Sequence, residues 1–219
     1  MSELVVNTVG TTGRGDRLLV LIHGYGADEY DLAPLAPHID PEGHFFTICP
    51  RGPHSVMGFG AGWYERTDDG IIDPATFLAA VDAIDATIDN ACSELGFNRS
   101  QAVIIGFSQG GAMTLASALR AGGATRPVAI ACLSGMLQQV DGLSYAFDDP
   151  GLPDILVHHG TLDPLVTVDR GRATRDTLTD NGVDHVYREY PMQHEISPPS
   201  VYDLRDWLGG YGSSSGNAH

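Results

Sequence analysis

The serine at position 108 has neighbours that suit a nucleophile of covalent catalysis. It belongs to the segment GFSQG at 106–110, which follows the apolar residues 103–105 and precedes a helical pattern. A serine on a sharp turn from strand to helix has a strained backbone, and glycines on both sides leave room for the neighbouring backbone. The serine hydroxyl then stands exposed above the sheet. This order of residues predicts a nucleophile elbow at Ser108.

A second match to the Gly-x-Ser-x-Gly pattern occurs at 212–216. The chain has 27 glycines, and chance alone supplies on the order of 0.2 such matches per chain, so the pattern needs its context. The second match has no apolar run before it and no helical pattern after it. We interpret residues 209–219 as a flexible polar tail. Ser108 is therefore the candidate.

A serine needs a base that accepts its proton, and the base needs a carboxylate that holds its tautomer. After an elbow of this kind, the order along the chain is serine, acid, histidine. Of the histidines beyond the plausible acids, His185 opens a predicted strand and His219 ends the chain, whereas His194 lies in a loop before the last predicted helix. Asp163 follows the buried run 155–159. We therefore predict a triad with Asp163 as the acid and His194 as the base.

A tetrahedral intermediate also needs donors for its oxyanion. The residue after the nucleophile, Gln109, offers its N–H at the start of a helix, and the loop after an early strand offers the N–H of Tyr25. We expect His23 in that loop to be a buried histidine that fixes the loop, not a catalyst. His158 and His159 are consecutive on a strand and face opposite sides, which argues against a shared metal site.

Short apolar runs alternate with helical patterns along the chain. Strands are predicted at 18–22, 45–49, 102–106, 128–133, 155–159 and 185–190, and helices at 73–96, 109–121, 166–180 and from about 197 onward. This alternation predicts an α/β fold with a mostly parallel central sheet and helices on both faces. In such sheets the ligand site lies beyond the carboxyl ends of the strands, where the candidate residues collect.

Composition favours a single domain, which we place at residues 1–208, before the polar tail. The 12 basic residues are all arginine, and with 28 acidic residues they give a formal net charge of −16. That charge argues against nucleic acid as a partner and against stable membrane association. No long apolar run or basic flank predicts a membrane span or a signal peptide, so we expect a cytoplasmic location. Cys49, Cys92 and Cys132 are expected to be buried free thiols.

Six segments together resemble the phospholipase/carboxylesterase family of α/β hydrolases, which includes small bacterial carboxylesterases and acyl-protein thioesterases. They are LIHGYGADEYDL (21–32), CPRGPHSVMGFGAGWYE (49–65), IIGFSQGGAM (104–113), LSGML (133–137), HHGTLDPLV (158–166) and PMQHEI (191–196). The resemblance implies an α/β-hydrolase fold without a separate lid domain, the triad Ser108, Asp163 and His194, and oxyanion donors at Tyr25 and Gln109. The chain departs from the family pattern at Tyr25, where leucine is commoner, and at Glu65, where aspartate is usual.

The aromatic stretch after residue 50 is the candidate pocket wall. Met57, Phe59, Trp63 and Tyr64 are predicted to line an acyl or alcohol pocket, with the alternative that Trp63 and Tyr64 pack the loop onto the sheet. The leading prediction is a serine carboxylesterase for small-molecule esters of short to medium acyl chains, without a metal or organic cofactor.

Three other functions stay open at this stage. The closest is an acyl-protein thioesterase or lysophospholipase acting on long chains. A dienelactone-type hydrolase would be expected to have cysteine at position 108, and a catalytically silent binding protein would be expected to lack a triad residue. A homodimer is compatible with the sequence.

Overall fold

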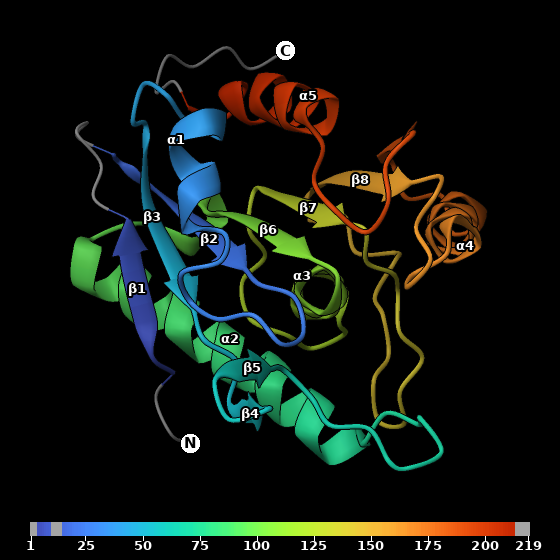
Figure 1. The fold of residues 1–219 in the computed structure, drawn as a ribbon. Coiled ribbons are helices and arrows are strands. Elements are labelled where there is room, and N and C mark those ends of the chain that lie inside the picture. Colours follow the sequence, from blue (N-terminus) through green and yellow to red (C-terminus); the bar gives the residue numbers. More distant parts are fainter. Residues whose placement is uncertain (1–3, 10–14, 213–219) are drawn as a thin grey trace.

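Seven strands form the central sheet of the computed structural model, which describes residues 4–9 and 15–212 (Figure 1). Their order across the sheet is β1-β3-β2-β6-β7-β8-β9, and β1 alone is antiparallel to its neighbour. The strands are β1 (Val6–Val9), β2 (Arg17–Ile22), β3 (Phe45–Pro50), β6 (Val103–Phe107), β7 (Ala129–Leu133), β8 (Asp154–Gly160) and β9 (Val186–Tyr190). The predicted mostly parallel sheet is confirmed.

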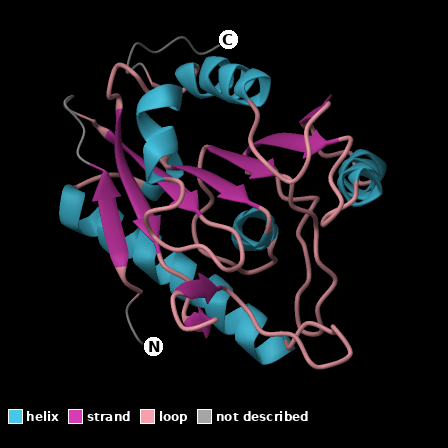
Figure 2. Ribbon diagram, viewed as in Figure 1, coloured by secondary structure: helices cyan, strands magenta, loops and turns pink. Residues whose placement is uncertain are grey.

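Helices cover both faces of this sheet (Figure 2). On one face lie α2 (Pro74–Leu95), α3 (Gln109–Leu119) and α4 (Val168–Asp180), and on the other lie α1 (Ala36–Ile39) and α5 (Pro198–Gly209). In Figure 1, α1 and α5 stand above the sheet, and α2 and α3 lie below it. Two short 3-10 turns, Ala33–Leu35 and Arg99–Gln101, precede α1 and β6.

Residues of a central strand alternate between two separate apolar cores. Leu18, Val20 and Ile22 of β2 pack with α2 and α3, whereas Leu19 and Leu21 pack with α1 and α5. All five side chains are fully buried. A continuous apolar run is therefore the expected pattern for this strand, since water reaches neither of its faces.

The structure contains elements that the sequence pattern did not predict. The edge strand β1 is only partly buried, and its two middle residues, Asn7 and Thr8, are polar, so its apolar signal is weak. The stretch after residue 50 contains a two-stranded hairpin, β4 (His54–Val56) and β5 (Gly60–Gly62). Helix α1 is only four residues long. Helices and strands this short contain too few residues for a helical or strand-like periodicity of apolar residues to be recognised.

The structure describes all three cysteines but only part of the predicted tail. Residues 209–212 are described, and the Tyr211 ring contacts that of Trp207 with a centroid distance of 5.1 Å. The rest of the predicted tail, including the second Gly-x-Ser-x-Gly match beyond Gly212, lies outside the described residues. Cys49, Cys92 and Cys132 are buried free thiols, as predicted. No helix within 15–212 has the length and apolar character needed to cross a bilayer.

Candidate active site

Ser108 lies on the turn between β6 and α3 with a backbone conformation that non-glycine residues rarely adopt. Its φ and ψ are 55° and −116°, and its N–H donates to the carbonyl of Leu133 at 2.8 Å. A Cβ at Gly106 would overlap the carbonyl of Gly110, and a Cβ at Gly110 would overlap that of Ile22. Glycine at both positions therefore permits the close approach, and the strained turn predicted from the sequence is present.

The imidazole of His194 lies between the side chains of Ser108 and Asp163. Its Nε2 is 2.8 Å from Ser108 Oγ, and its Nδ1 is 2.6 Å from Asp163 Oδ2. The ring also packs against Phe107, with a centroid distance of 4.9 Å. In this geometry Nδ1–H donates to the carboxylate and Nε2 accepts from the hydroxyl. The structure thus brings together the three residues chosen from their positions after strands.

Asp163 is held by several donors although its side chain is fully buried. Its Oδ1 accepts from the N–H groups of Leu165 and Val166, both at 2.9 Å, which leaves Oδ2 for His194. Behind it, His159 Nε2 donates to the Val166 carbonyl at 2.8 Å. These hydrogen bonds hold the buried carboxylate in place, so it can fix the orientation of His194.

The loops after β8 and β9 are joined to each other, which explains why Asp163 meets His194 across 31 positions of sequence. The N–H of Leu162 donates to the Met192 carbonyl at 3.1 Å. A Cβ at Gly160 would overlap this same Met192 carbonyl. Glycine at the end of β8 therefore lets the histidine loop pack closely against the aspartate loop.

Two backbone N–H groups near Ser108 are free to bind an oxyanion. Within the described part of the chain, neither the N–H of Tyr25 nor that of Gln109 donates to a protein acceptor. Both residues line the same cavity as Ser108. The loop that carries Tyr25 is held in place because Gly26 N–H donates to the Ala61 carbonyl at 2.8 Å. Free N–H groups fixed beside a nucleophile are the feature that stabilises a tetrahedral intermediate.

His23 is a buried structural residue, as predicted, with only 1% of its surface exposed. Its Nε2 accepts from the N–H of Gly52 at 3.0 Å, so Nδ1 carries the proton and donates to the Gly24 carbonyl at 2.7 Å. Burial lowers the pKa of His23, which favours this neutral form. The histidine thus ties the loop after β2 to the start of the hairpin segment.

A cavity of about 700 Å³ opens beside Ser108. Its size suits a small organic molecule. The lining is mixed, because polar and charged side chains occur beside two tyrosines and three aliphatic side chains. The lining residues are Tyr25, His54, Ser55, Val56, Gly62, Tyr64, Glu65, Arg66, Ser108, Gln109, Gly135, Met136, Gln138 and Val166.

The pocket prediction needs correction, because of its four residues only Tyr64 lines this cavity. Trp63 is fully buried, and its Nε1 donates to the His23 carbonyl at 2.9 Å, so it packs the loop onto the sheet. Met57 and Phe59 are 84% and 77% exposed. They lie at the turn of the β4–β5 hairpin, where the chain reverses and side chains project into solvent.

The Gln109 side chain has a role that the sequence did not indicate. Its Oε1 accepts from the Trp63 N–H at 2.8 Å, and its Nε2 donates to the Tyr64 carbonyl at 3.2 Å. The side chain therefore connects the start of α3 to the cavity wall. The unpredicted lining residues His54, Arg66, Met136 and Gln138 come from loops and a short strand that carry no periodic pattern.

A second serine–histidine contact lies away from the cavity. His158 Nδ1 is 3.0 Å from Ser200 Oγ, but both residues are fully buried and neither lines the cavity. A nucleophile must be reached by its substrate, so this pair is part of the packing between β8 and α5. Across residues 4–9 and 15–212, no group of three or more His, Cys, Asp or Glu side chains could hold a metal ion.

Comparison with known proteins agrees with this geometry. The family model described as Phospholipase/Carboxylesterase matches residues 7–210. Carboxylesterase SOBER1 of Arabidopsis thaliana is 34% identical over 144 residues, which cover 63% of this chain and 60% of the relative. Lysophospholipase-like protein 1 of Mus musculus is 25% identical over 215 residues, covering 91% of this chain and 89% of the relative.

Solved structures show the same fold. A carboxylesterase from Mesorhizobium loti superimposes with a TM-score of 0.77 at 26% identity, covering 96% of this chain and 97% of the other. The Bacillus cereus carboxylesterase superimposes with a TM-score of 0.80 at 19% identity, covering 95% and 94%. The α/β-hydrolase fold predicted from the sequence is confirmed.

Proposed function

Because the chain belongs to the phospholipase/carboxylesterase family and is a carboxylesterase-family hydrolase, we propose that it cleaves esters of short to medium acyl chains with Ser108, His194 and Asp163. The observation that carries the proposal is the pair of hydrogen bonds that His194 makes, one to the serine hydroxyl and one to the aspartate. The cavity beside that serine supports a small ester as the substrate.

In the proposed mechanism, Ser108 Oγ attacks the ester carbonyl while His194 Nε2 takes the hydroxyl proton. The N–H groups of Tyr25 and Gln109 stabilise the oxyanion of the tetrahedral intermediate. The intermediate collapses as His194 gives its proton to the departing alcohol, which leaves an acyl group on Ser108. A water molecule then attacks this acyl-enzyme, again with His194 as the base, and the acid is released. Asp163 stabilises the imidazolium in both halves.

The preference for short to medium acyl chains is supported by the residues around the cavity. The aliphatic lining side chains are Val56, Met136 and Val166, and the rest of the lining combines two tyrosines with polar and charged side chains. Each CH₂ left in water forgoes roughly 0.8 kcal/mol of binding free energy. A long acyl chain therefore gains little here beyond the first carbons. The predicted cytoplasmic location and the absence of nucleic-acid and membrane partners stay predictions.

The first experiment tests the nucleophile with Ser108→Ala. We expect a loss of ester hydrolysis on the order of 10⁶-fold in kcat, because the variant has no group to acylate. The melting temperature should stay close to that of the wild type, since this half-exposed hydroxyl contributes little packing. A fluorophosphonate probe should label the wild type at Ser108. The control is Ser55→Ala, which removes an exposed hydroxyl from the same cavity and should leave both activity and labelling intact.

A second experiment tests acyl length with p-nitrophenyl esters from acetate to palmitate. We expect the highest kcat/KM at short to medium chains and little further gain beyond them. A steady rise up to the palmitoyl ester would instead support the thioesterase or lysophospholipase function. Labelling at Ser214 by the fluorophosphonate, or full activity of Ser108→Ala, would overturn the assignment of the nucleophile.

A further inference from the structure

Arg66 lines the cavity and, among the residues that the structure describes, has no carboxylate partner. Among the arginines of residues 15–212, only Arg66 and Arg170 lack an Asp or Glu oxygen within 4.0 Å. In a chain with 28 acidic residues, an unpaired guanidinium is unusual. Arg170 is exposed at the start of α4 and does not line the cavity. Arg66 is thus the unpaired arginine that a bound substrate can meet.

The position of Arg66 is held, but most of its donors are free. Its Nη1 donates to the Gly70 carbonyl at 2.8 Å, and its guanidinium lies over the Tyr64 ring, 5.6 Å from the centroid. A guanidinium has five N–H donors in a planar fork that matches the two oxygens of a carboxylate. The contacts with Gly70 and Tyr64 therefore restrain the side chain and leave N–H groups for a ligand.

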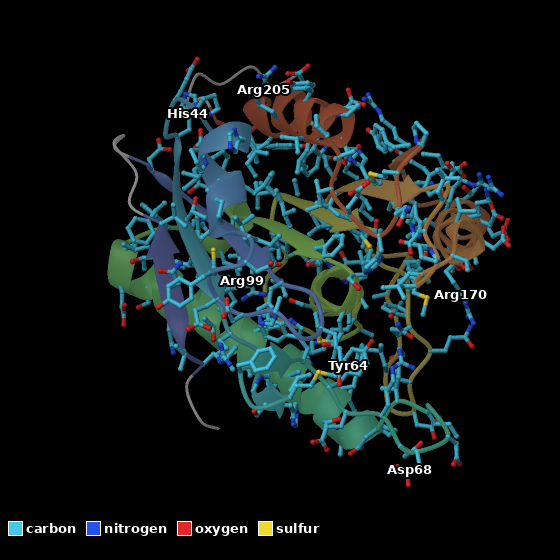
Figure 3. The ribbon with its side chains drawn as sticks, viewed as in Figure 1. His44, Tyr64, Asp68, Arg99, Arg170 and Arg205 are labelled. Atoms are coloured by element: carbon cyan, nitrogen blue, oxygen red, sulfur yellow. The ribbon has the colours of Figure 1, made fainter. Side chains whose placement is uncertain are left out.

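The acidic groups nearby do not neutralise this arginine. Glu65, the neighbouring cavity residue, has its Oε1 3.4 Å from His54 Nδ1 and makes no ion pair with Arg66. Asp68 and Asp69 are exposed in the following loop. Figure 3 shows Asp68 at the outer end of that loop, away from Tyr64. The charged groups of the cavity lining are therefore the unpaired guanidinium of Arg66 and the carboxylate of Glu65, which faces His54.

The acyl part of the ester is the part that occupies this cavity in the proposed mechanism. Ser108 and Gln109 line the cavity, whereas His194, which gives its proton to the departing alcohol, does not. The alcohol must lie beside His194 when it leaves, so the acyl chain extends to the other side. Tyr64, Glu65 and Arg66 line the cavity that the acyl chain then enters.

From these observations we infer that the preferred acyl group ends in a carboxylate, so that the substrates are half-esters of dicarboxylic acids whose free end is bound by Arg66. The inference rests on the proposed function. The net charge of −16 repels an anionic substrate at long range. The exposed guanidinium of Arg66 in the cavity lining offsets this repulsion where the substrate binds.

The test compares two esters of the same shape, monoethyl adipate and its terminal primary amide, with ethanol release as the readout. The two differ only in charge at the far end of the acyl chain. We expect the wild type to favour the carboxylate by roughly fivefold in kcat/KM, the size of a partly exposed ion pair. Arg66→Gln should remove this preference, so that the two esters are hydrolysed with similar kcat/KM. Glu65→Gln should increase the preference, because it removes a nearby negative charge.

Arg170→Gln is the matched control, since it removes the other unpaired arginine and the same charge from outside the cavity. It should keep the wild-type ratio. A wild-type ratio of one or less, or an equal loss of preference in Arg66→Gln and Arg170→Gln, would refute the inference. Hydrolysis of ethyl pentanoate without cleavage of either adipate ester would also refute the inference. In each of these cases the proposed function survives if neutral-ester hydrolysis depends on Ser108. It fails if Ser108→Ala retains that activity.

Discussion

Acid should destabilise this protein through the buried imidazole of His158. The Tyr190 hydroxyl donates to Asp203 at 2.7 Å, so its oxygen accepts from His158 Nε2–H at 3.2 Å, and Nδ1 accepts from Ser200 at 3.0 Å. The neutral imidazole is therefore fully hydrogen-bonded. Burial lowers the pKa of His158 from 6.5 to about 4. The nearby carboxylate of Asp203 opposes this shift, and the positive charge of Arg188 adds to it.

The sign and size of the effect follow from this difference between the folded and unfolded states. Between the unfolded pKa of 6.5 and the folded value of about 4, the unfolded chain binds a proton that the folded chain refuses. The free energy of unfolding must therefore fall as the pH falls, by about 1.4 kcal/mol per pH unit within that window. Acidification from pH 7 to pH 5 then costs about 2 kcal/mol through this one residue.

Urea unfolding of the wild type and of His158→Gln at several pH values measures the effect. The glutamine variant should be less stable at pH 7, because it loses packing and hydrogen bonds. The difference in the free energy of unfolding between the wild type and the variant should be about 2 kcal/mol smaller at pH 5 than at pH 7, since glutamine does not titrate. His38→Gln, which replaces an exposed histidine of α1, should follow the wild type throughout.

The argument is refuted if the free energies of unfolding of the wild type and His158→Gln change with pH in parallel. A difference between them that grows as the pH falls would show an effect of the opposite sign. If the variant does not fold, the His158 ring protons can be followed by NMR in the wild type. Titration of that ring near pH 6.5 would equally contradict the account.

Two further predictions concern the candidate site and its support. Asp163→Asn should keep the fold but lower kcat on the order of 10⁴-fold, because an amide cannot hold His194 in the required tautomer; ester assays combined with circular dichroism test this, and a loss below tenfold would contradict it. Gly110→Ala should destabilise the protein by more than about 2 kcal/mol in urea unfolding, because its Cβ would overlap the Ile22 carbonyl. Gly209→Ala, with open space at the new Cβ, is its control and should be neutral or slightly stabilising.

Several features of this protein could be read directly from short stretches of sequence. Strands β2, β6 and β7 are buried on both faces, so each is an apolar run that is followed by a polar or glycine-containing loop. Parallel strands bring those loops to one edge of the sheet. Ser108 follows β6 directly, whereas Asp163 and His194 lie in the loops after β8 and the edge strand β9. The structure places their side chains within hydrogen-bonding distance. The buried role of His23 was predictable for the same reason.

The cavity wall, in contrast, was decided by contacts between segments far apart in the chain. Trp63 and Tyr64 are both buried, but only Tyr64 also lines the cavity. The sequence did not distinguish them, because the Gln109 side chain and the His23 carbonyl hold that segment from about forty residues away along the chain. The unpaired state of Arg66 likewise depends on where the acidic side chains lie after folding. A strand side chain takes its direction from its own backbone period, but a loop side chain takes it from the partners that the tertiary fold supplies.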